Sequence, residues 1–237
     1  MRVAVHQPQY LPWLGYFDKI DRADLFVLLD TVQFKKNEWQ NRNRIKTAQG
    51  WQWLTVPVTY RFPQRINQVK IKPQSNWARK HLLALRTNYS KAPYFSDYFD
   101  IFQKILTERW PGLAALNIRL VRAFTEVLGI STPLRVASEL GPLPEGPNER
   151  LIAICQHLDA EVYLAGMGGR DYMHLGKFEK AGIEVVFQEF NPPVYPQLYG
   201  DFLPDLSVVD LLFNCGKQSL GIIRGARKES ELKGEVS

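Results

Sequence analysis

The sequence is poor in cysteine and contains no long apolar run. Its 237 residues include two cysteines, Cys155 and Cys215, and neither stands at metal-ligand spacing from a histidine. A disulfide framework and a metal site are therefore not expected, and both thiols are predicted to be buried and free.

No apolar run approaches the roughly 20 residues of a membrane-spanning helix, and no charged leader precedes an apolar stretch at the N-terminus. We expect a cytoplasmic protein with no membrane span.

Acidic residues are almost absent from one stretch of the chain. Between residues 31 and 80 there are eleven lysines and arginines and a single acid, Glu38. That segment carries a net charge of +10, eleven minus one, and because the whole chain carries +6 the remainder carries −4. A positive field concentrated in one part of a fold attracts anions. The charge distribution therefore predicts a phosphorylated ligand or, as an alternative, nucleic acid.

Short apolar runs alternate with stretches of helical periodicity, and apolar residues make up 45% of the chain. The runs at residues 3–5 and 25–29 flank a stretch in which Leu14, Phe17 and Ile20 recur at helical intervals. Strand, helix and strand in about 30 residues form a βαβ unit. The pattern predicts an α/β fold with a single doubly wound, Rossmann-like and mainly parallel sheet of five strands. The later strands are expected at residues 134–137, 162–165 and 185–187, and helices between and after them at 148–158, 175–181 and 207–214.

A β-hairpin and a helical section are expected to be inserted at about residues 50–129. Residues 51–58 are predicted to pair antiparallel with residues 66–71 at the edge of the main sheet. Residues 1–224 would form one domain, and residues 225–237, which lose apolar periodicity, a flexible tail. Helices of the insertion are expected at residues 76–87, 93–108 and 113–128, the last ending at Gly129.

Polar and aromatic side chains follow the first predicted strand. In an open parallel sheet, ligands bind outside the carboxyl ends of the strands, where strand order reverses. The loop that begins with His6 and Gln7 lies there, and a histidine exchanges a proton near neutral pH without a large pKa shift. We predict catalytic roles for His6 and Gln7 and substrate contacts for Tyr10 and Trp13. The alternative is that the histidine is structural and the aromatic residues belong to the core.

A second polar cluster follows the second predicted strand. In an extended segment Arg42 and Arg44 point to the same face, where two guanidinium groups grip one phosphate, while Asn41 and Asn43 face the other way. This cluster is predicted to bind the substrate, the alternative being a solvated basic loop. The residues predicted to contact substrate here are Asp30, Gln33, Lys35, Trp39, Asn41, Arg42, Asn43 and Arg44.

A glycine-rich turn follows the strand expected at residues 162–165. Glycine backbone between a strand and a helix approaches a phosphate closely and presents its N–H groups. Gly168, Gly169 and Arg170 are therefore predicted to bind the substrate. The spacing is not that of a P-loop or of a dinucleotide fingerprint.

At these residues the sequence resembles the WbqC-like family, and the resemblance extends over nearly the whole chain. The family occurs in gene clusters for bacterial O-antigen and related surface polysaccharides, so the resemblance implies an aminoacyl (glycine) transferase that acts on an amino sugar. Asn148 stands where family members often carry Thr, which keeps a small polar residue at the start of a helix. The stretches that carry the resemblance are 6–20 (HQPQYLPWLGYFDKI), 32–36, 39–46, 51–57, 148–151, 169–172, 194–197 and 211–216.

A fainter similarity concerns residues 13–16, Trp-Leu-Gly-Tyr. They fall where nucleotidyltransferases and their ligase relatives place a His-x-Gly-His motif between the first strand and the first helix. In this sequence Trp13 and Tyr16 stand at the two histidine positions. The similarity implies a shared fold with ATP as a ligand, but without the two histidines that assist departure of the phosphate.

The leading hypothesis is transfer of an acyl or aminoacyl group to the amine of a nucleotide-linked sugar. His6 would accept a proton from the amine, Arg42 and Arg44 would hold the diphosphate, and the neighbouring amide side chains would orient sugar or donor. The alternatives are an ATP-dependent nucleotidyltransferase or ligase-like enzyme, and a non-enzymatic nucleic-acid-binding protein, which the absence of a nucleic-acid module disfavours. ATP and a nucleotide-activated donor are the candidate cofactors, and the oligomeric state does not follow from the sequence.

Overall fold

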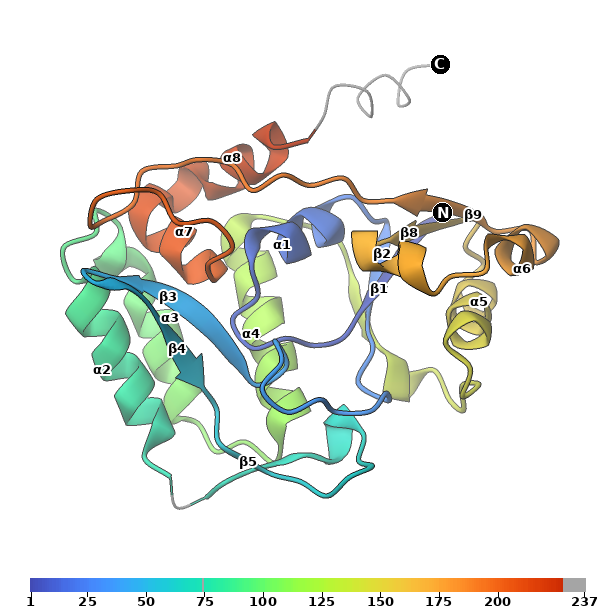
Figure 1. The fold of residues 1–237 in the computed structure, drawn as a ribbon, viewed down its shortest axis with the longest axis horizontal. Helices are drawn as coiled ribbons and strands as arrows, with labels where there is room; N and C mark the ends of the chain where they lie inside the picture. The colour runs from blue at the N-terminus through green and yellow to red at the C-terminus, as the bar shows by residue number, and fades with distance from the viewer. Residues whose placement is uncertain (74, 228–237) are drawn as a thin grey trace.

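The centre of the fold is a five-stranded, all-parallel sheet (Figure 1). The structure is a computed structural model that describes residues 1–73 and 75–227. Residues 228–237, most of the tail predicted at 225–237, lie outside the described residues. The predicted α/β fold with a five-stranded parallel sheet is confirmed. The strands are β1 (Arg2–His6), β2 (Leu25–Leu28), β7 (Leu134–Val136), β8 (Val162–Ala165) and β9 (Glu184–Phe187).

The chain winds outward from β1 in both directions. β2 and then β7 follow on one side of β1, and β8 and then β9 follow on the other. Strand order therefore reverses between β1 and β8, and the connections that leave these two strands diverge and open a crevice at their carboxyl ends. His6 ends β1 and Ala165 ends β8, so residues just after these two positions bound the crevice.

Helices cover both faces of the sheet. Ala4 of β1 packs in a cluster with α1 and α4, whereas Val3 and Val5 pack in a second cluster with α5 and α6. Successive side chains of a strand point to opposite faces, so even this short apolar run supplies a contact to each layer. These helices are α1 (Leu14–Asp21), α4 (Leu113–Leu128), α5 (Pro147–His157) and α6 (Leu175–Lys180).

Two small antiparallel sheets and two helices are inserted between β2 and α4. The prediction that residues 51–58 pair with residues 66–71 at the edge of the main sheet is wrong for most of that range. β4 pairs with β3 instead, only β5 and β6 pair as expected, and neither small sheet joins the main one. The strands are β3 (Arg42–Thr47), β4 (Gly50–Thr55), β5 (Val58–Thr59) and β6 (Lys70–Ile71), and the inserted helices are α2 (Trp77–Tyr89) and α3 (Phe95–Thr107).

β3 was not predicted from the sequence because its composition is polar. Asn43, Ile45 and Thr47 alternate as buried positions, and Lys46 between the last two is buried as well. The Asn43 amide Nδ2 donates a hydrogen bond to the carbonyl of Leu11 at 2.6 Å, which satisfies a polar group inside the protein. Gly50 starts β4 with a φ of 119°, a conformation that favours glycine. The strand therefore depends on a partner from a distant segment rather than on an apolar run.

The remaining elements include one helix that the sequence did not predict, α8 (Ser219–Gly225). α4 has its predicted bounds and ends at Gly129, whose φ of 77° is left-handed. None of the helices within residues 1–73 and 75–227 combines the length and apolar character needed to cross a bilayer. The other elements are α7 (Val208–Cys215), η1 (Ile66–Gln68), η2 (Ala137–Glu139), η3 (Met167–Asp171) and η4 (Gly216–Gln218).

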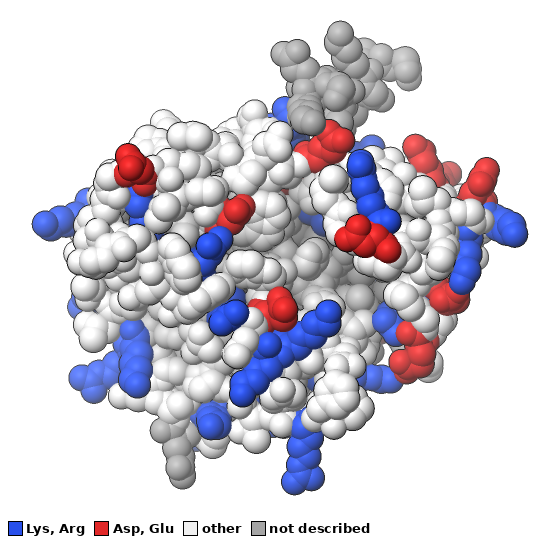
Figure 2. All heavy atoms as spheres, viewed as in Figure 1, with Lys and Arg blue, Asp and Glu red and all other residues white. Residues whose placement is uncertain are grey.

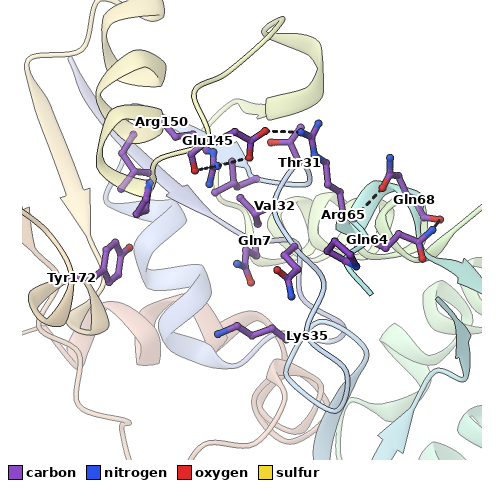
Figure 3. Close-up of a pocket in the computed structure, with 15 residues that line it drawn as sticks. Gln7, Thr31, Val32, Lys35, Gln64, Arg65, Gln68, Glu145, Arg150 and Tyr172 are labelled. Atoms are coloured by element: carbon purple, nitrogen blue, oxygen red, sulfur yellow. Dashed lines mark hydrogen bonds and ion pairs between the residues drawn. The ribbon is translucent and has the colours of Figure 1, made fainter. Parts of the chain in front are cut away.

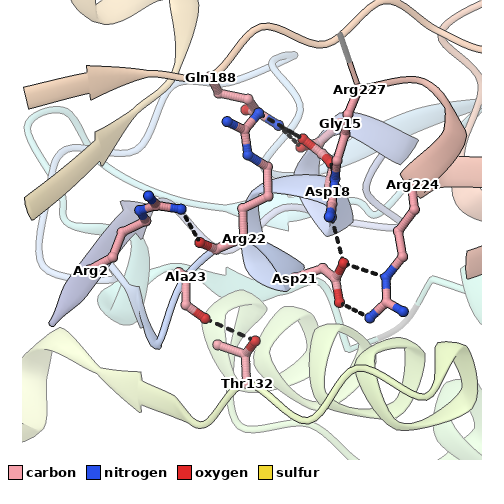
Figure 4. A network of polar contacts seen from close by, with 10 residues as sticks. All are labelled: Arg2, Gly15, Asp18, Asp21, Arg22, Ala23, Thr132, Gln188, Arg224 and Arg227. Atoms are coloured by element: carbon pink, nitrogen blue, oxygen red, sulfur yellow. Dashed lines mark hydrogen bonds and ion pairs between the residues drawn. The ribbon is translucent and has the colours of Figure 1, made fainter. Parts of the chain in front are cut away.

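A network of ion pairs ties the end of the described chain to α1 (Figure 4). Asp18 is fully buried; its Oδ1 accepts from Arg227 Nε and its Oδ2 from Gln188 Nε2, both at 2.7 Å. Asp21 accepts hydrogen bonds from Arg224 Nε and Nη2 at 2.8 and 2.7 Å. The network therefore joins α1 to the segment after β9 and to the end of α8.

Candidate functional site

A continuous groove opens at the carboxyl ends of β1, β2 and β8. Its wide part has a volume of about 860 Å³, and two adjoining hollows of about 320 and 240 Å³ form its inner part. Gln7 and Tyr172 line both the wide part and the neighbouring hollow, and His6 and Lys19 line both inner hollows. Figure 2 shows the groove as a hollow near the middle of the molecular face. Its place is the one at which a doubly wound sheet binds ligands.

His6 stands at the end of β1 in the inner part of the groove and is half-buried. Its Nδ1 lies 3.1 Å from the carbonyl oxygen of Gln7, and its ring packs edge-on against Tyr16 with 4.8 Å between ring centroids. Burial, together with the nearby charge of Lys19, lowers the pKa of His6 to about 3. The imidazole is therefore neutral at neutral pH, donating through Nδ1 to the Gln7 carbonyl and leaving Nε2 as an acceptor.

Lys19 is one of the groove residues that sequence reasoning missed. It lies on α1, is 3% exposed, and its Nζ donates a hydrogen bond to the carbonyl of Val5 at 2.9 Å. Burial lowers the pKa of Lys19 to about 7. The sequence contains one signal for it: Lys19 lies three residues after Tyr16 and one before Ile20, on a helix whose residues 14–20 are all buried. A lysine at such a position is removed from solvent.

The glycine-rich turn after β8 forms the opposite wall of the inner part. Gly168 and Gly169 line it, and a side chain added at Gly168 would meet no atom within 4 Å. Gly169 is buried, and a Cβ there would lie 2.9 Å from the sulfur of Met173. Arg170 does not line the groove, because its guanidinium stacks on Phe187 at 5.0 Å. The turn therefore lines the groove with glycine backbone, whereas the Arg170 side chain lies against Phe187 outside the groove.

Asn148 holds the end of this turn. It is the second residue of α5, not the N-cap. Its Nδ2 donates to the carbonyl of Tyr172 at 3.3 Å, and its Oδ1 accepts from the backbone N–H of His174 at 2.9 Å. Tyr172, which lines both parts of the groove, is thereby fixed to α5.

Cations and amides surround the wide part of the groove (Figure 3). Gln33 and Lys35 line it, and the Lys35 side chain extends toward the side on which Tyr172 lies. Arg65 Nη2 donates to Glu145 Oε1 at 2.8 Å across an exposed ion pair. Two arginines of this wall, Arg65 and Arg150, were not predicted as site residues, and they come from segments far apart in the sequence.

Hydrogen bonds fasten the loop that carries Lys35 to the end of β1. Gln40 Nε2 donates to Gln7 Oε1 at 2.6 Å, and Gln40 Oε1 accepts from the backbone N–H of Lys35 at 2.9 Å. The position of Lys35 at the rim is therefore set by Gln7, which itself lines the groove.

Arg42 and Arg44 lie on a tryptophan surface outside the groove. They share one face of β3, as predicted from their spacing. Arg42 stacks on Trp53 at 4.0 Å, and Arg44 lies 5.4 Å from the ring of Trp51 and 5.9 Å from that of Trp39. Neither arginine lines any part of the groove. We call these five residues the Arg–Trp surface.

The structure divides the predicted site residues into two sets. The residues that line the groove are His6, Gln7, Trp13, Gln33, Lys35, Gly168 and Gly169. The residues that do not line it are Tyr10, Asp30, Trp39, Asn41, Arg42, Asn43, Arg44 and Arg170.

Four buried residues of the second set hold the surroundings of the groove through hydrogen bonds. Asp30 Oδ2 accepts from the hydroxyl of Ser138 at 2.7 Å, which joins the ends of β2 and β7. Asn41 Nδ2 donates to the Val56 carbonyl at 3.1 Å. The Asn43 side-chain amide donates a hydrogen bond to the Leu11 carbonyl. Tyr10 is hydrogen-bonded to His81, with 2.7 Å between Tyr10 Oη and His81 Nδ1.

Tyr10→Phe is expected to lower the free energy of unfolding by about 1–2 kcal/mol, because it removes a buried hydrogen bond and leaves His81 Nδ1 without that partner. Ligand affinity is expected to change less than about twofold, since Tyr10 is fully enclosed and does not face the groove. Urea unfolding and ligand titration of the same variant measure both quantities. A large loss of affinity with unchanged stability would assign Tyr10 to the ligand instead.

Within residues 1–73 and 75–227 no three side chains of the metal-ligating types His, Cys, Asp and Glu come together in a cluster. Both cysteines are buried, and burial raises the pKa of Cys155 to about 12 and that of Cys215 to about 11. The thiols are therefore protonated at neutral pH and unreactive as nucleophiles.

Fold and groove together define an α/β protein with a groove at the switch point of a doubly wound parallel sheet. The chain matches the model of the WbqC-like protein family over residues 7–222, and it belongs to that family. It is 40% identical to the uncharacterized protein Rv1507c of Mycobacterium tuberculosis over 231 residues, which cover 96% of this chain and 99% of that protein. No solved structure matches the chain. The family match includes the lining residues of the groove from Gln7 to Phe190, and two further lining residues, Val5 and His6, lie just before it.

Proposed function

We propose that the protein transfers an acyl or aminoacyl group, such as glycyl, to the amine of a nucleotide-linked sugar in the assembly of bacterial surface polysaccharide. One observation carries the proposal: neutral His6 and Lys19, with its lowered pKa, meet at the inner end of a groove whose wide part is rimmed by cations. Amide formation requires an uncharged nucleophile and a group that exchanges protons near neutral pH.

The wide part is suited to the nucleotide diphosphate. Its volume of about 860 Å³ lies within the roughly 300–1,000 Å³ typical of small-molecule sites. Lys35 and Arg65 are exposed cations at its rim, and a guanidinium group binds phosphate oxygens in a bidentate manner. Glu145 now accepts from Arg65, and a phosphate would exchange for this exposed carboxylate at low cost.

The inner part is suited to the reacting amine. His6 Nε2 accepts a hydrogen bond from the amine and directs its lone pair toward the acyl carbon. No carboxylate of the described residues lines this part, so nothing there holds the amine as an ammonium ion. Trp13 and Phe190, 5.5 Å apart at their ring centroids, give the inner wall an apolar surface.

A nucleotide-linked amino sugar at about 100 times its Kd is expected to stabilise the protein by about 2.7 kcal/mol, which is roughly 5–10 °C in Tm for a chain of this size. Arg65→Ala is expected to weaken binding about 10- to 100-fold, because a charge-assisted hydrogen bond to phosphate contributes about 1.5–3 kcal/mol. Thermal shifts across a panel of nucleotide-sugars, ATP and a short oligonucleotide measure this. Mass spectrometry of acceptor mixed with acyl donors measures the transfer.

The matched control for this experiment is Arg44→Ala, which removes an arginine of the Arg–Trp surface. It should leave nucleotide-sugar affinity unchanged. If Arg44→Ala loses binding and Arg65→Ala does not, the diphosphate binds on the Arg–Trp surface. A shift with ATP alone, accompanied by pyrophosphate release, would replace the proposal with nucleotidyl transfer, and a shift with the oligonucleotide alone would replace it with nucleic-acid binding.

A further inference from the structure

We propose that Lys19 is the proton acceptor of this transfer: its neutral amine takes the proton that the acceptor amine loses as the new amide bond forms. The inference rests on the proposed function and changes the role that the sequence assigned to His6. It makes a helix residue buried beneath the groove, rather than the histidine at the strand end, the base of the reaction.

The geometry places the Lys19 amine at the wall shared by both inner hollows of the groove. Within residues 1–73 and 75–227 its Nζ makes one hydrogen bond, to the carbonyl of Val5 at 2.9 Å. Both hollows of the inner part are lined by Lys19 together with His6 and Gly166. A Cβ added at Gly166 would stand 3.9 Å from Nζ, so the missing side chain of this glycine leaves the approach to the amine open.

No acidic side chain of the described residues pairs with Lys19 or lines the inner part of the groove. Asp18, its neighbour on α1, accepts instead from Gln188 and Arg227. Burial of an ammonium ion without a carboxylate partner raises the free energy of the charged form, so the neutral amine is favoured and the pKa of the lysine falls. With its pKa lowered to about 7, about half of Lys19 is the free base at pH 7.

The other titratable groups that line the inner part are unsuited to accept the proton. His6 of β1 has a pKa of about 3 and is too weak a base at neutral pH. Burial raises the pKa of Tyr16 on α1 and of Tyr163 on β8 well above the ordinary value, and that of Tyr172, after η3, is also raised. All three phenols are therefore protonated. Among the described residues that line this part, Lys19 has the pKa best matched to the task.

The step balances with an acyl donor activated as an ester or a thioester. The lone pair of the acceptor amine forms a bond to the acyl carbon, and the amine proton passes to Lys19 Nζ. The bond from the acyl carbon to the leaving oxygen or sulfur then breaks with its electron pair. Lys19 returns the proton to this leaving group, so an amide and an alcohol or thiol are formed and the lysine ends as the free base.

Lys19→Met tests the inference through kcat. Proton transfer contributes about 10²–10⁴ in rate, so kcat for acyl transfer is expected to fall by that factor, while affinity for the nucleotide-sugar in the thermal-shift titration changes less than about threefold. The wild-type profile of kcat against pH should have an acidic limb near pH 7. His6→Ala should keep this limb, because the titrating group is Lys19. The control is Lys177→Met, which removes an exposed lysine paired with Glu149.

Two results overturn the inference, and they are distinguishable. If the wild type transfers an acyl group and Lys19→Met retains kcat within about tenfold, or keeps the acidic limb, the base is another residue and the proposed function stands. If the wild type transfers to no amino sugar in the panel, the proposed function fails and this role of Lys19 fails with it.

Discussion

Lys19→Met is expected to raise the free energy of unfolding at pH 6.5 by about 2–3 kcal/mol, although it removes the residue that we place at the centre of the chemistry. Burial lowers the pKa of Lys19 from 10.5 to about 7. Between these two pH values the unfolded chain binds more protons at this site than the folded chain. The ammonium therefore destabilises the fold fully below pH 7, and stability rises as the pH increases toward 10.5. Loss of the hydrogen bond to Val5 offsets about 1 kcal/mol of the gain.

Urea unfolding of wild type and variant at pH 6.5 and at pH 9.5 measures this effect. The advantage of the variant should shrink by about 2–3 kcal/mol at the higher pH, because the folded wild type has then released the proton and no longer contains a buried ammonium ion. Lys46→Met is the matched control: Lys46 is equally buried, but its Nζ donates to Gln197 Oε1 at 3.0 Å and to the Asp201 carbonyl at 2.5 Å. Its loss should destabilise the protein. A Lys19→Met variant less stable than wild type at both pH values would mean that the buried amine is compensated.

Asp18→Ala is expected to lower the free energy of unfolding by about 3–5 kcal/mol, because removal of one partner leaves buried cations and amides without their acceptor. Asp18 is fully buried and accepts from Gln188 Nε2 and Arg227 Nε at 2.7 Å each, and Arg22 Nη1 lies 3.8 Å from its Oδ2. Asp18→Asn keeps an acceptor oxygen and should lose less. Chemical denaturation of the three proteins, wild type and both variants, gives the comparison.

An exposed ion pair supplies the control for Asp18. Glu149 and Lys177 are each about half exposed, with 2.5 Å between Glu149 Oε1 and Lys177 Nζ. Glu149→Ala should therefore cost less than about 1 kcal/mol, since exposed pairs are solvated and screened by salt. If Asp18→Ala costs no more than Glu149→Ala, the network that joins α8 to α1 contributes nothing to stability.

Most of the sheet and several helices could be predicted because their signals are local. β8 and α4 have the predicted bounds, since an apolar run or a helical repeat depends only on neighbouring residues, and Gly129 ends α4 for a steric reason that is equally local. β3 could not be predicted in this way. Its buried Asn43 is compatible with a strand only because Leu11, from another segment, supplies the acceptor.

The candidate site was predicted in outline for the same reason. His6 ends a strand, Gln7 and Gly168 follow strand ends, and parallel strands bring such positions to one edge of the sheet. The dense polar cluster after β2 did not reach the groove as a unit. Lys35 lines the groove, whereas Arg42 and Arg44 stack on tryptophans that β4 and a neighbouring loop place beside them.

By itself the sequence determined the strands of the main sheet and most of the helices, that positive charge gathers in residues 31–80, and that polar groups follow the strands at one edge of a parallel sheet. Only the tertiary structure decided which of those groups face a common groove and in which protonation state. Arg65 and Arg150 come from segments far apart in the chain and line the same part of the groove. The pKa of Lys19 depends on burial that α1, β1 and the turn after β8 create together, because the free energy of an ammonium ion is set by the solvent and the partners around it and not by its neighbours in the sequence.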